Sequence, residues 1–285
     1  MRQTDFRAAI VAALCMAALA APPTARAQAP AEDKWTFSLM PYLWLPNFSG
    51  KFNYGPPPSG GVTANVTVDA NTILSDLDFA FMIAGEARKG RWSIGTDVIY
   101  LDLSSDNSQV KSVDFNPAPG PVNVSTSNLN AGTQSSIKGT VWTLVGGYAL
   151  VEGREADLDV IGGFRYLGIE PKTDWQLNAA VNLPNSTLSF ARSGSVEKRE
   201  NLWAAIVGAK GQVRLGESNW FVPYYVDLGG ASSLFTWQGV VGVGYKFRWG
   251  DVRLDYRYLY YDQSGDKLIQ DLAVAGFALG VNFRF

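Results

Sequence analysis

Long segments of this chain alternate strictly between apolar residues and small or polar residues. In the last segment, every second position from Ala273 to Phe285 is apolar, and Gly276, Gly280 and Arg284 stand among the positions between them. Successive side chains of a β-strand point to opposite faces of the sheet. The alternation therefore predicts a strand with one apolar, aromatic face and one face of small or charged residues.

The same pattern recurs along the chain. Ten segments show it: residues 34–46, 78–89, 91–103, 138–150, 157–169, 200–214, 219–230, 235–249, 251–262 and 270–285. Each exceeds the usual strand of about five or six residues and can cross a bilayer at the usual tilt, which takes about 9–11 residues. An apolar outer face and a polar inner face are typical of a transmembrane barrel and the inverse of a soluble one. The predicted fold is all-β, a transmembrane antiparallel up-and-down β-barrel of about ten strands. Eight or twelve strands would fit if one segment is misassigned or if residues 62–68 pair.

The connections between these segments differ in length. Tight connections lie near residues 90, 153, 216 and 250, and two further short ones lie at 231–234 and 263–269. Long connections, rich in Gly, Pro, Ser and Asn, lie at 47–77, 104–137 and 170–199. Short turns at one end and long loops at the other indicate an outer-membrane barrel with both termini at the periplasmic end. The long external loops would either contact a surface ligand or be merely solvated.

The tryptophans sort by the predicted end of the barrel. One set falls beside the tight connections: Trp35, Trp92, Trp220 and Trp249. A second set falls toward the long connections: Trp44, Trp142, Trp203 and Trp237. Two sets at opposite strand ends match the aromatic girdles of the two membrane interfaces. Tryptophans that merely filled a soluble core would not sort in this way.

The N-terminal residues have the three parts of a secretory signal peptide. Two arginines precede an apolar stretch at residues 8–21, and a small-x-small cleavage pattern ends at Ala27. The apolar stretch is too short for a membrane-spanning helix, which needs about 20 residues. We therefore expect a cleaved signal peptide, residues 1–27, followed by one outer-membrane barrel domain, residues 28–285.

The chain ends on a phenylalanine that has apolar residues at alternate positions behind it: Phe277, Leu279, Val281, Phe283 and Phe285. This arrangement resembles the C-terminal signal that outer-membrane barrels present to the barrel-assembly machinery. We therefore expect these residues to be an assembly signal and that machinery to be a partner. The protein would be exported through the periplasm to the outer membrane of a Gram-negative bacterium, among outer-membrane lipid and lipopolysaccharide.

Six short blocks occur along the chain: residues 41–45 (PYLWL), 77–82 (LDFAFM), 86–92 (EARKGRW), 227–230 (DLGG), 235–238 (FTWQ) and 256–258 (YRY). Together they resemble an uncharacterised family of proteobacterial outer-membrane β-barrel proteins that is broadly OmpW-like. The resemblance covers most of the chain after the signal peptide, outside the long loops. It implies a fold and a location and brings no catalytic residues. One departure is the sequence at 231–233 (ASS), where a turn containing glycine is expected.

The composition excludes most catalytic sites. The chain contains no histidine, and its single cysteine, Cys15, lies inside the apolar stretch of the signal peptide. A lipid-bearing Cys15 is the alternative, but Leu14 stands where a lipoprotein needs a small residue. Histidine alone titrates near neutral pH when unperturbed, so Ser-His-Asp, Cys-His and His-based zinc sites are all excluded. We expect no enzyme, no cofactor and no metal, although a carboxylate pair would still be able to act.

The net charge and one acidic cluster bear on the ligands that the chain could bind. The formal net charge is −2, and no Lys/Arg run is present, which argues against a nucleic-acid partner. Asp69, Asp76 and Asp78 are close together in the first long connection. Two interpretations are open: the three carboxylates bind Ca²⁺, or they are simply solvated, as acidic loop residues commonly are. Their spacing fits no known calcium loop.

Charged residues also fall on the predicted inner face of the strands: Glu86, Arg88, Asp97, Asp159, Arg165, Asp227, Lys246, Arg248, Arg253, Asp255, Arg257 and Arg284. Their signs are mixed. They would pair across the strands and plug the lumen, or they would set the selectivity of a narrow pore.

Three functions are therefore open. The first is a structural or surface-recognition barrel with a lumen filled by side chains. The second is a narrow channel or lateral-exit conduit for small or apolar solutes, by analogy with OmpW-like barrels. The third is a secreted soluble β-barrel that binds a ligand.

Overall fold

Ten antiparallel strands close into a barrel. The computed structural model describes residues 34–53, 63–105, 129–183, 186–197, 199–264 and 269–285, which belong to one unit, residues 34–285. The strands are β1 (Trp35–Asn53), β2 (Thr63–Val68), β3 (Leu77–Lys89), β4 (Trp92–Ser105), β5 (Leu129–Glu152), β6 (Ala156–Leu183), β7 (Ser186–Glu197), β8 (Glu200–Arg214), β9 (Trp220–Ala231), β10 (Leu234–Lys246), β11 (Gly250–Gln263) and β12 (Ile269–Arg284). A short helix, α2 (Ala70–Ser75), precedes β3. The predicted signal peptide lies outside the described residues.

The ring closes where the last strand of the chain meets the first. Neighbours in sequence pair in turn around the sheet, and β12 then pairs with β1, from Ser38 opposite Arg284 to Phe52 opposite Ile269. At the end of the chain, the backbone groups of Phe37 and Phe285 exchange hydrogen bonds of 3.2 and 2.9 Å. Closure pairs the first strand of the ring with the last, so neither is left as a free edge. The prediction of an up-and-down barrel of about ten strands is confirmed.

Two strands lie off this ring. The segment β2 pairs with the end of β1, and β7 pairs with β6. The sequence allows a different number of ring strands if residues 62–68 pair with a neighbour. They do pair in large part, but as an appendage to β1, so the ring keeps ten strands.

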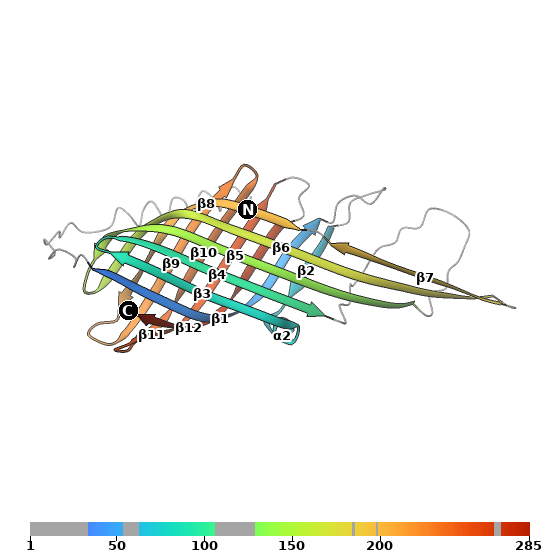
Figure 1. Cartoon of the computed structure of the whole chain (residues 1–285), viewed down its shortest axis with the longest axis horizontal. Helices are drawn as coiled ribbons and strands as arrows, with labels where there is room; N and C mark the ends of the chain where they lie inside the picture. Colours follow the sequence, from blue (N-terminus) through green and yellow to red (C-terminus); the bar gives the residue numbers. More distant parts are fainter. Residues whose placement is uncertain (1–33, 54–62, 106–128, 184–185, 198, 265–268) are drawn as a thin grey trace, which may run out of the picture. The chain divides into compact units, whose positions relative to one another are not determined.

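The strands beside the long connections run further than the sequence predicted. Strand β5 begins at Leu129, β6 continues to Leu183, and β7 follows, so residues 129–137 and most of 170–199 are strand rather than loop. These strands project as a narrow sheet beyond the long-loop end of the barrel (Figure 1). In β6 the alternation of Trp175 and Leu177 with polar neighbours is present in the sequence. The Gly, Ser and Asn residues that surround this alternation favour a loop and obscure the strand pattern.

The outer face of the ring is covered by large apolar side chains. In the last three strands, Val241, Leu254 and Phe277 are 55%, 51% and 60% exposed. On the same strands the alternate positions Gln238, Asp255 and Ala278 are buried. The facing predicted for these strands is therefore confirmed. No helix among the described residues has the length and apolar character needed to span a membrane.

Tight turns join the strands at one end of the barrel. Gly90 and Gly216, in two of these turns, have φ angles of 56° and 64°. Glycine is the residue that adopts such angles without steric cost. The turns keep β3 close to β4 and β8 close to β9, which fixes the register of both hairpins.

Seven of the eight tryptophans assigned to the girdles lie on the outer face of the barrel. Trp35, Trp92, Trp220 and Trp249 are exposed beside the tight turns, as predicted. At the other end, Trp203 is exposed and Trp142 and Trp237 are half-buried against neighbouring rings. The assignment of Trp44 is wrong, because its side chain is 2% exposed and points into the barrel. The phase of the first strand could not be read from its sequence.

A charge on the outer face near mid-strand tests the orientation of the wall. We expect Val243→Arg to lower the free energy of unfolding by about 2–4 kcal/mol, since a charge at mid-membrane must be desolvated. Urea unfolding in lipid vesicles measures this change.

Val213→Arg is the matched control. Val213 also faces outward, but it lies at the end of β8 beside a tight turn, where the cost falls to about 0–1 kcal/mol. Equal and small effects at both positions would contradict the facing.

Candidate functional site

The inner face of the barrel carries two kinds of side chain. Toward the long-loop end it is apolar, and toward the tight turns it is polar and charged. The lumen is the candidate functional site, since the charged residues singled out in the sequence were predicted to face it.

The apolar part is a packed layer, called here the apolar layer: Trp44, Met82, Ile99, Leu101, Leu167, Ile169, Leu202, Ala204, Ile206, Leu234, Leu259, Tyr261, Leu272, Val274 and Ala278. These residues come from eight of the ten ring strands and are all buried. Tyr261 and Leu259 are each 1% exposed. The layer fills the lumen at this level, as side chains do in small barrels.

A buried ion pair lies beside the apolar layer. Arg165 on β6 and Asp227 on β9 have side chains that are 0% exposed, and the guanidinium Nη2 binds the carboxylate Oδ2. Arg165 also donates from Nε to Thr143 Oγ1 at 3.2 Å and from Nη1 to Thr236 Oγ1 at 3.4 Å. One arginine thus ties together β5, β6, β9 and β10 across the inside of the ring.

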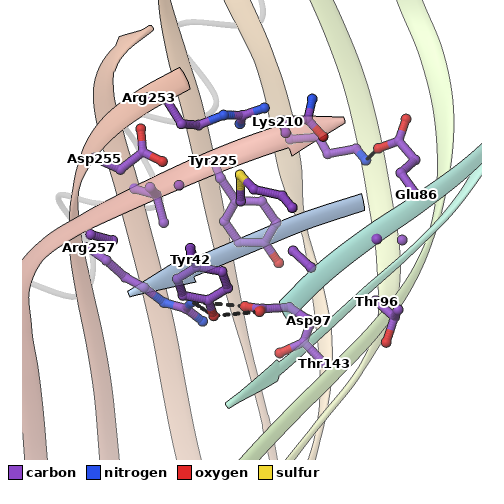
Figure 2. Close-up of a pocket in the computed structure, with 18 of the residues that line it drawn as sticks. Tyr42, Glu86, Thr96, Asp97, Thr143, Lys210, Tyr225, Arg253, Asp255 and Arg257 are labelled. Atoms are coloured by element: carbon purple, nitrogen blue, oxygen red, sulfur yellow. Dashed lines mark hydrogen bonds and ion pairs between the residues drawn. The ribbon is translucent and has the colours of Figure 1, made fainter. Parts of the chain in front are cut away.

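A second arginine, Arg257 on β11, is bound in the same manner. Arg257 Nη1 lies 2.8 Å from Asp97 Oδ2 and donates to Tyr42 Oη at 3.0 Å. Tyr42 in turn donates to Asp97 at 2.6 Å, so the three groups form a closed triangle (Figure 2). The guanidinium also lies 4.9 Å from the ring of Trp44, in cation–π contact, and donates to Gln238 Oε1 at 2.8 Å.

Charges near the tight turns form two further networks. In the first, Glu86 binds Lys210 and Arg88, and Arg88 also binds Asp159. Together they link β3, β6 and β8. Each charge therefore has a partner of opposite sign from another strand.

The second network centres on Asp251, whose side chain is fully buried. It accepts hydrogen bonds from Arg253 at 3.2 Å, from Asn282 at 2.9 Å and from Arg284 at 2.7 Å. Two cations lie over the ring of Phe221: Lys246 Nζ is 5.1 Å and the guanidinium carbon of Arg253 is 5.9 Å from its centroid.

A cavity of about 230 Å³ remains between these groups. Glu86, Lys210, Arg253, Asp255 and Tyr225 are among the side chains that line it (Figure 2). Among the described groups, Asp255 Oδ1 and Tyr225 Oη are buried without a hydrogen-bond partner. The cavity has room for water but is smaller than the roughly 300–1,000 Å³ of typical ligand sites.

The structure places eleven of the twelve predicted lumen charges on the inner wall or at its rim. These are Glu86, Arg88, Asp97, Asp159, Arg165, Asp227, Lys246, Arg253, Asp255, Arg257 and Arg284. Arg248 is the exception and a correction. Strand β10 ends at Lys246, so Arg248 lies exposed in the tight turn that follows.

Sequence reasoning missed three residues that complete these networks: Tyr42, Lys210 and Asp251. Asp251 lies on the same face as Arg253, two positions earlier in β11, and this spacing was a signal that could have found it. Lys210 is the single charged residue between Glu200 and Arg214 on β8, so no charge pattern marked it.

The acidic residues of the first long connection have partners within the protein. Asp69 caps α2 by accepting from Thr72 N at 2.8 Å, and these hydrogen bonds hold the pKa of Asp69 below its usual value. Asp78 accepts from Ser104 Oγ at 2.5 Å. Within the described part of the chain, no cluster of three or more metal-binding side chains occurs.

Comparisons with known proteins add little to this geometry. No family model and no curated protein sequence matches the chain. Among solved structures, the outer membrane protease OmpT from Escherichia coli has 9% identity and a TM-score of 0.49, covering 91% of this chain and 99% of OmpT. The attachment invasion locus protein Ail of Yersinia pestis has 11% identity and a TM-score of 0.32, covering 88% and 98%. The CymD monoaromatic hydrocarbon channel has 9% identity and a TM-score of 0.29, covering 88% of each chain.

These neighbours include an enzyme and non-enzymes, so they leave the absence of catalysis as a prediction based on composition. The resemblance to OmpW-like barrels stays a prediction as well.

The buried pair between β6 and β9 is the sharpest test of the lumen. We expect Arg165→Met to lower the free energy of unfolding by about 3–5 kcal/mol, because it leaves the carboxylate of Asp227 buried without a counter-charge. Denaturant unfolding of the refolded barrel measures this loss.

The double variant Arg165→Met/Asp227→Leu removes both charges and should recover most of that stability. A double variant as unstable as the sum of the two single variants would show that the two groups do not act as a pair.

Proposed function

We propose that this chain is an outer-membrane barrel of a Gram-negative bacterium, closed to solutes by its own side chains and acting at the cell surface through the sheet that it projects. The proposal has three parts: the membrane, the plugged lumen and the projecting sheet. Each is supported by a separate set of observations.

The membrane location is supported by the outer wall. Exposed apolar side chains surround the ring, and they would be costly in water over so continuous a surface. A closed ring satisfies its backbone groups internally, which is what a bilayer core demands. A secreted soluble barrel, the third possibility from the sequence, would carry the opposite pattern.

The apolar layer is the observation that carries the plugged lumen. It fills the barrel with buried aliphatic and aromatic groups, and the Arg165–Asp227 pair lies against it. An ion would have to pass through this layer without water or charge partners. The charges of the lumen therefore serve to hold strands together rather than to select a solute.

The projecting sheet supports a role in surface recognition. Strand β6 pairs with β5 as far as Ala179 opposite Leu129, and with β7 as far as Leu183 opposite Ser186. Within the described residues, β7 has β6 as its one strand neighbour, so its other edge is open to a partner strand.

The C-terminal strand supports recognition by the barrel-assembly machinery. Phe277, Leu279, Phe283 and Phe285 are all exposed on the outer face, and Val281 lies on the same face. This leaves the apolar alternation accessible along one side of β12. The route through the periplasm follows from the predicted signal peptide.

Conductance across a planar bilayer tests the plugged lumen. We expect refolded protein, verified by its heat-dependent gel shift, to give no discrete current steps. The double variant Leu259→Ala/Tyr261→Ala, which removes two large side chains from the apolar layer, should open a water path and give steps. Steps from the unsubstituted protein would contradict the proposal.

A second candidate function is a lateral conduit for apolar solutes, and a gap in the wall favours it. Strands β1 and β3 pair from Trp35 to Pro41, and beyond Pro41 no residue pair is formed between them in the described chain. At this seam the backbone N of Trp44 contacts Met82 Sδ at 3.1 Å in place of a strand partner. The apolar layer lies directly behind the seam.

Cross-linking the seam tests this second candidate. Cysteines at Leu43 and Phe81, both exposed on the outer wall, would be bridged by a short bismaleimide. If apolar solutes pass here, the bridge should lower the uptake of Nile red by expressing cells several-fold. The same bridge at Phe37 and Ala87, which are paired across the ladder, is the control. Equal uptake in both cross-linked proteins would exclude the seam as a route.

A further inference from the structure

The outer wall of β4, β5, β6 and the start of β8 carries three rows of side chains that differ sharply in character. The rows follow from the register of the ladders. Trp142, Tyr166 and Trp203 are opposite one another in the first row, and their rings contact each other, with Tyr166 and Trp203 centroids 4.8 Å apart. Phe164 packs against Trp142 at 5.1 Å, which completes an outer aromatic cluster of four rings.

The second row, one step toward the long-loop end, is small at its centre. Tyr100, Thr140, Gly168 and Asn201 are opposite one another across the four strands. A Cβ atom at Gly168 would lie 2.6 Å from Tyr166 Oη, so the tyrosine ring leans over the space that a side chain would take. Tyr166 Oη is fixed there by donating to Asn201 Oδ1 at 2.6 Å.

The third row is charged, with alternating sign. It contains Asp102, Lys138, Glu170 and Arg199. Lys138 Nζ lies 3.0 Å from Asp102, and Arg199 Nε donates to Glu170 at 3.0 Å. The side chains of Lys138 and Arg199 are 53% and 65% exposed, so both cations lie at the surface of the wall.

Between the aromatic row and the charged row the small residues leave a hollow of about 210 Å³. It is lined by Tyr100, Lys138, Thr140, Tyr166, Gly168, Ile169, Glu170, Arg199 and Asn201. The hollow thus has an aromatic floor formed by Tyr100 and Tyr166, hydroxyl and amide groups on its sides, and two cations at its rim. Two strand spacings separate these cations, which is about 10 Å.

We propose that this hollow binds the phosphorylated sugar headgroup of an outer-leaflet glycolipid, of the lipopolysaccharide type. The inference rests on the proposed membrane location, which puts the aromatic cluster at the interface on the external side. A sugar ring packs its C–H groups on the aromatic faces, and its hydroxyls meet Thr140 and Asn201. Phosphate groups bind Lys138 and Arg199 through charge-assisted hydrogen bonds.

This composition favours a glycolipid over a phospholipid. A phospholipid phosphate would use the cations but would leave the aromatic floor and the polar sides without a matching group. The alternating carboxylates also disfavour a site that holds a phosphate by charge alone. The hollow is therefore a site for a headgroup that presents both sugar and phosphate.

The test uses the full chain, expressed and purified from the outer membrane in detergent. Binding is followed by tryptophan fluorescence, since Trp142 and Trp203 belong to the aromatic cluster beside the hollow, and Trp203 packs on Tyr166. We expect purified lipopolysaccharide to bind at least tenfold more tightly than phosphatidylglycerol. Lys138→Gln/Arg199→Gln should weaken lipopolysaccharide binding by about tenfold or more, given the usual contribution of a basic residue at an anionic headgroup. Gly168→Leu should weaken it to a similar degree by filling the hollow without changing any charge.

The double variant Arg154→Gln/Arg248→Gln is the matched control, because it removes two exposed arginines from the tight turns at the opposite rim. It should bind as the unsubstituted protein does. Wild-type affinity in both hollow variants, or equal displacement by phosphatidylglycerol, would overturn the inference.

Absence of a heat-modifiable barrel from the outer-membrane fraction would instead count against the proposed function, so the two failures are distinguishable. If Gly168→Leu does not fold, the double variant Lys138→Gln/Arg199→Gln decides the result.

Discussion

Closure of the backbone ring is the constraint on which the rest of this structure depends. A strand with free N–H and C=O groups is costly in a bilayer core, so the first and last strands must find each other. They do so over a long ladder, from Ser38 opposite Arg284 to Phe52 opposite Ile269. Once the ring is closed, each strand has its apolar side turned outward, and every polar side chain on the other face is confined to a narrow lumen. The charge chemistry of the protein follows from that confinement.

Confinement explains why the lumen charges occur as networks. In a narrow lumen a charge cannot be solvated freely, and an unpaired one would cost several kcal/mol. Arg165 therefore binds Asp227, Arg257 binds Asp97, and the groups near the tight turns share partners. The partners come from strands far apart in sequence, so each pair also fixes the position of one strand against another. The apolar layer then completes the filling, and it needs no partners.

The sequence predicted the strands and the direction in which most of their faces point, because alternation encodes both. It could not predict which lumen charges pair, because that depends on the stagger of the strands in three dimensions. Alternation predicted the ten ring strands and the outward side of the last three, because one buried face repeats every second residue. It could not show that Arg165 meets Asp227, since 62 positions separate them and the stagger of the strands decides which charges meet. Trp44 was misplaced because apolar residues stand on both faces of β1, at Leu43 and Leu45 as well as Trp44, so its phase was ambiguous.

The inward position of Trp44 and the gap in the wall have a common origin. Pro41 ends the ladder between β1 and β3, and a proline offers no N–H with which to continue it. Beyond that point β1 must satisfy its backbone elsewhere, and Trp44 N contacts Met82 Sδ while its indole Nε1 donates to Gly276 O at 3.2 Å. Turning the indole inward fills the barrel behind the gap and places the ring under the guanidinium of Arg257. The weakest part of the wall is thereby supported from inside by the same residues that close the lumen, so a barrel that opened laterally here would also have to loosen its plug.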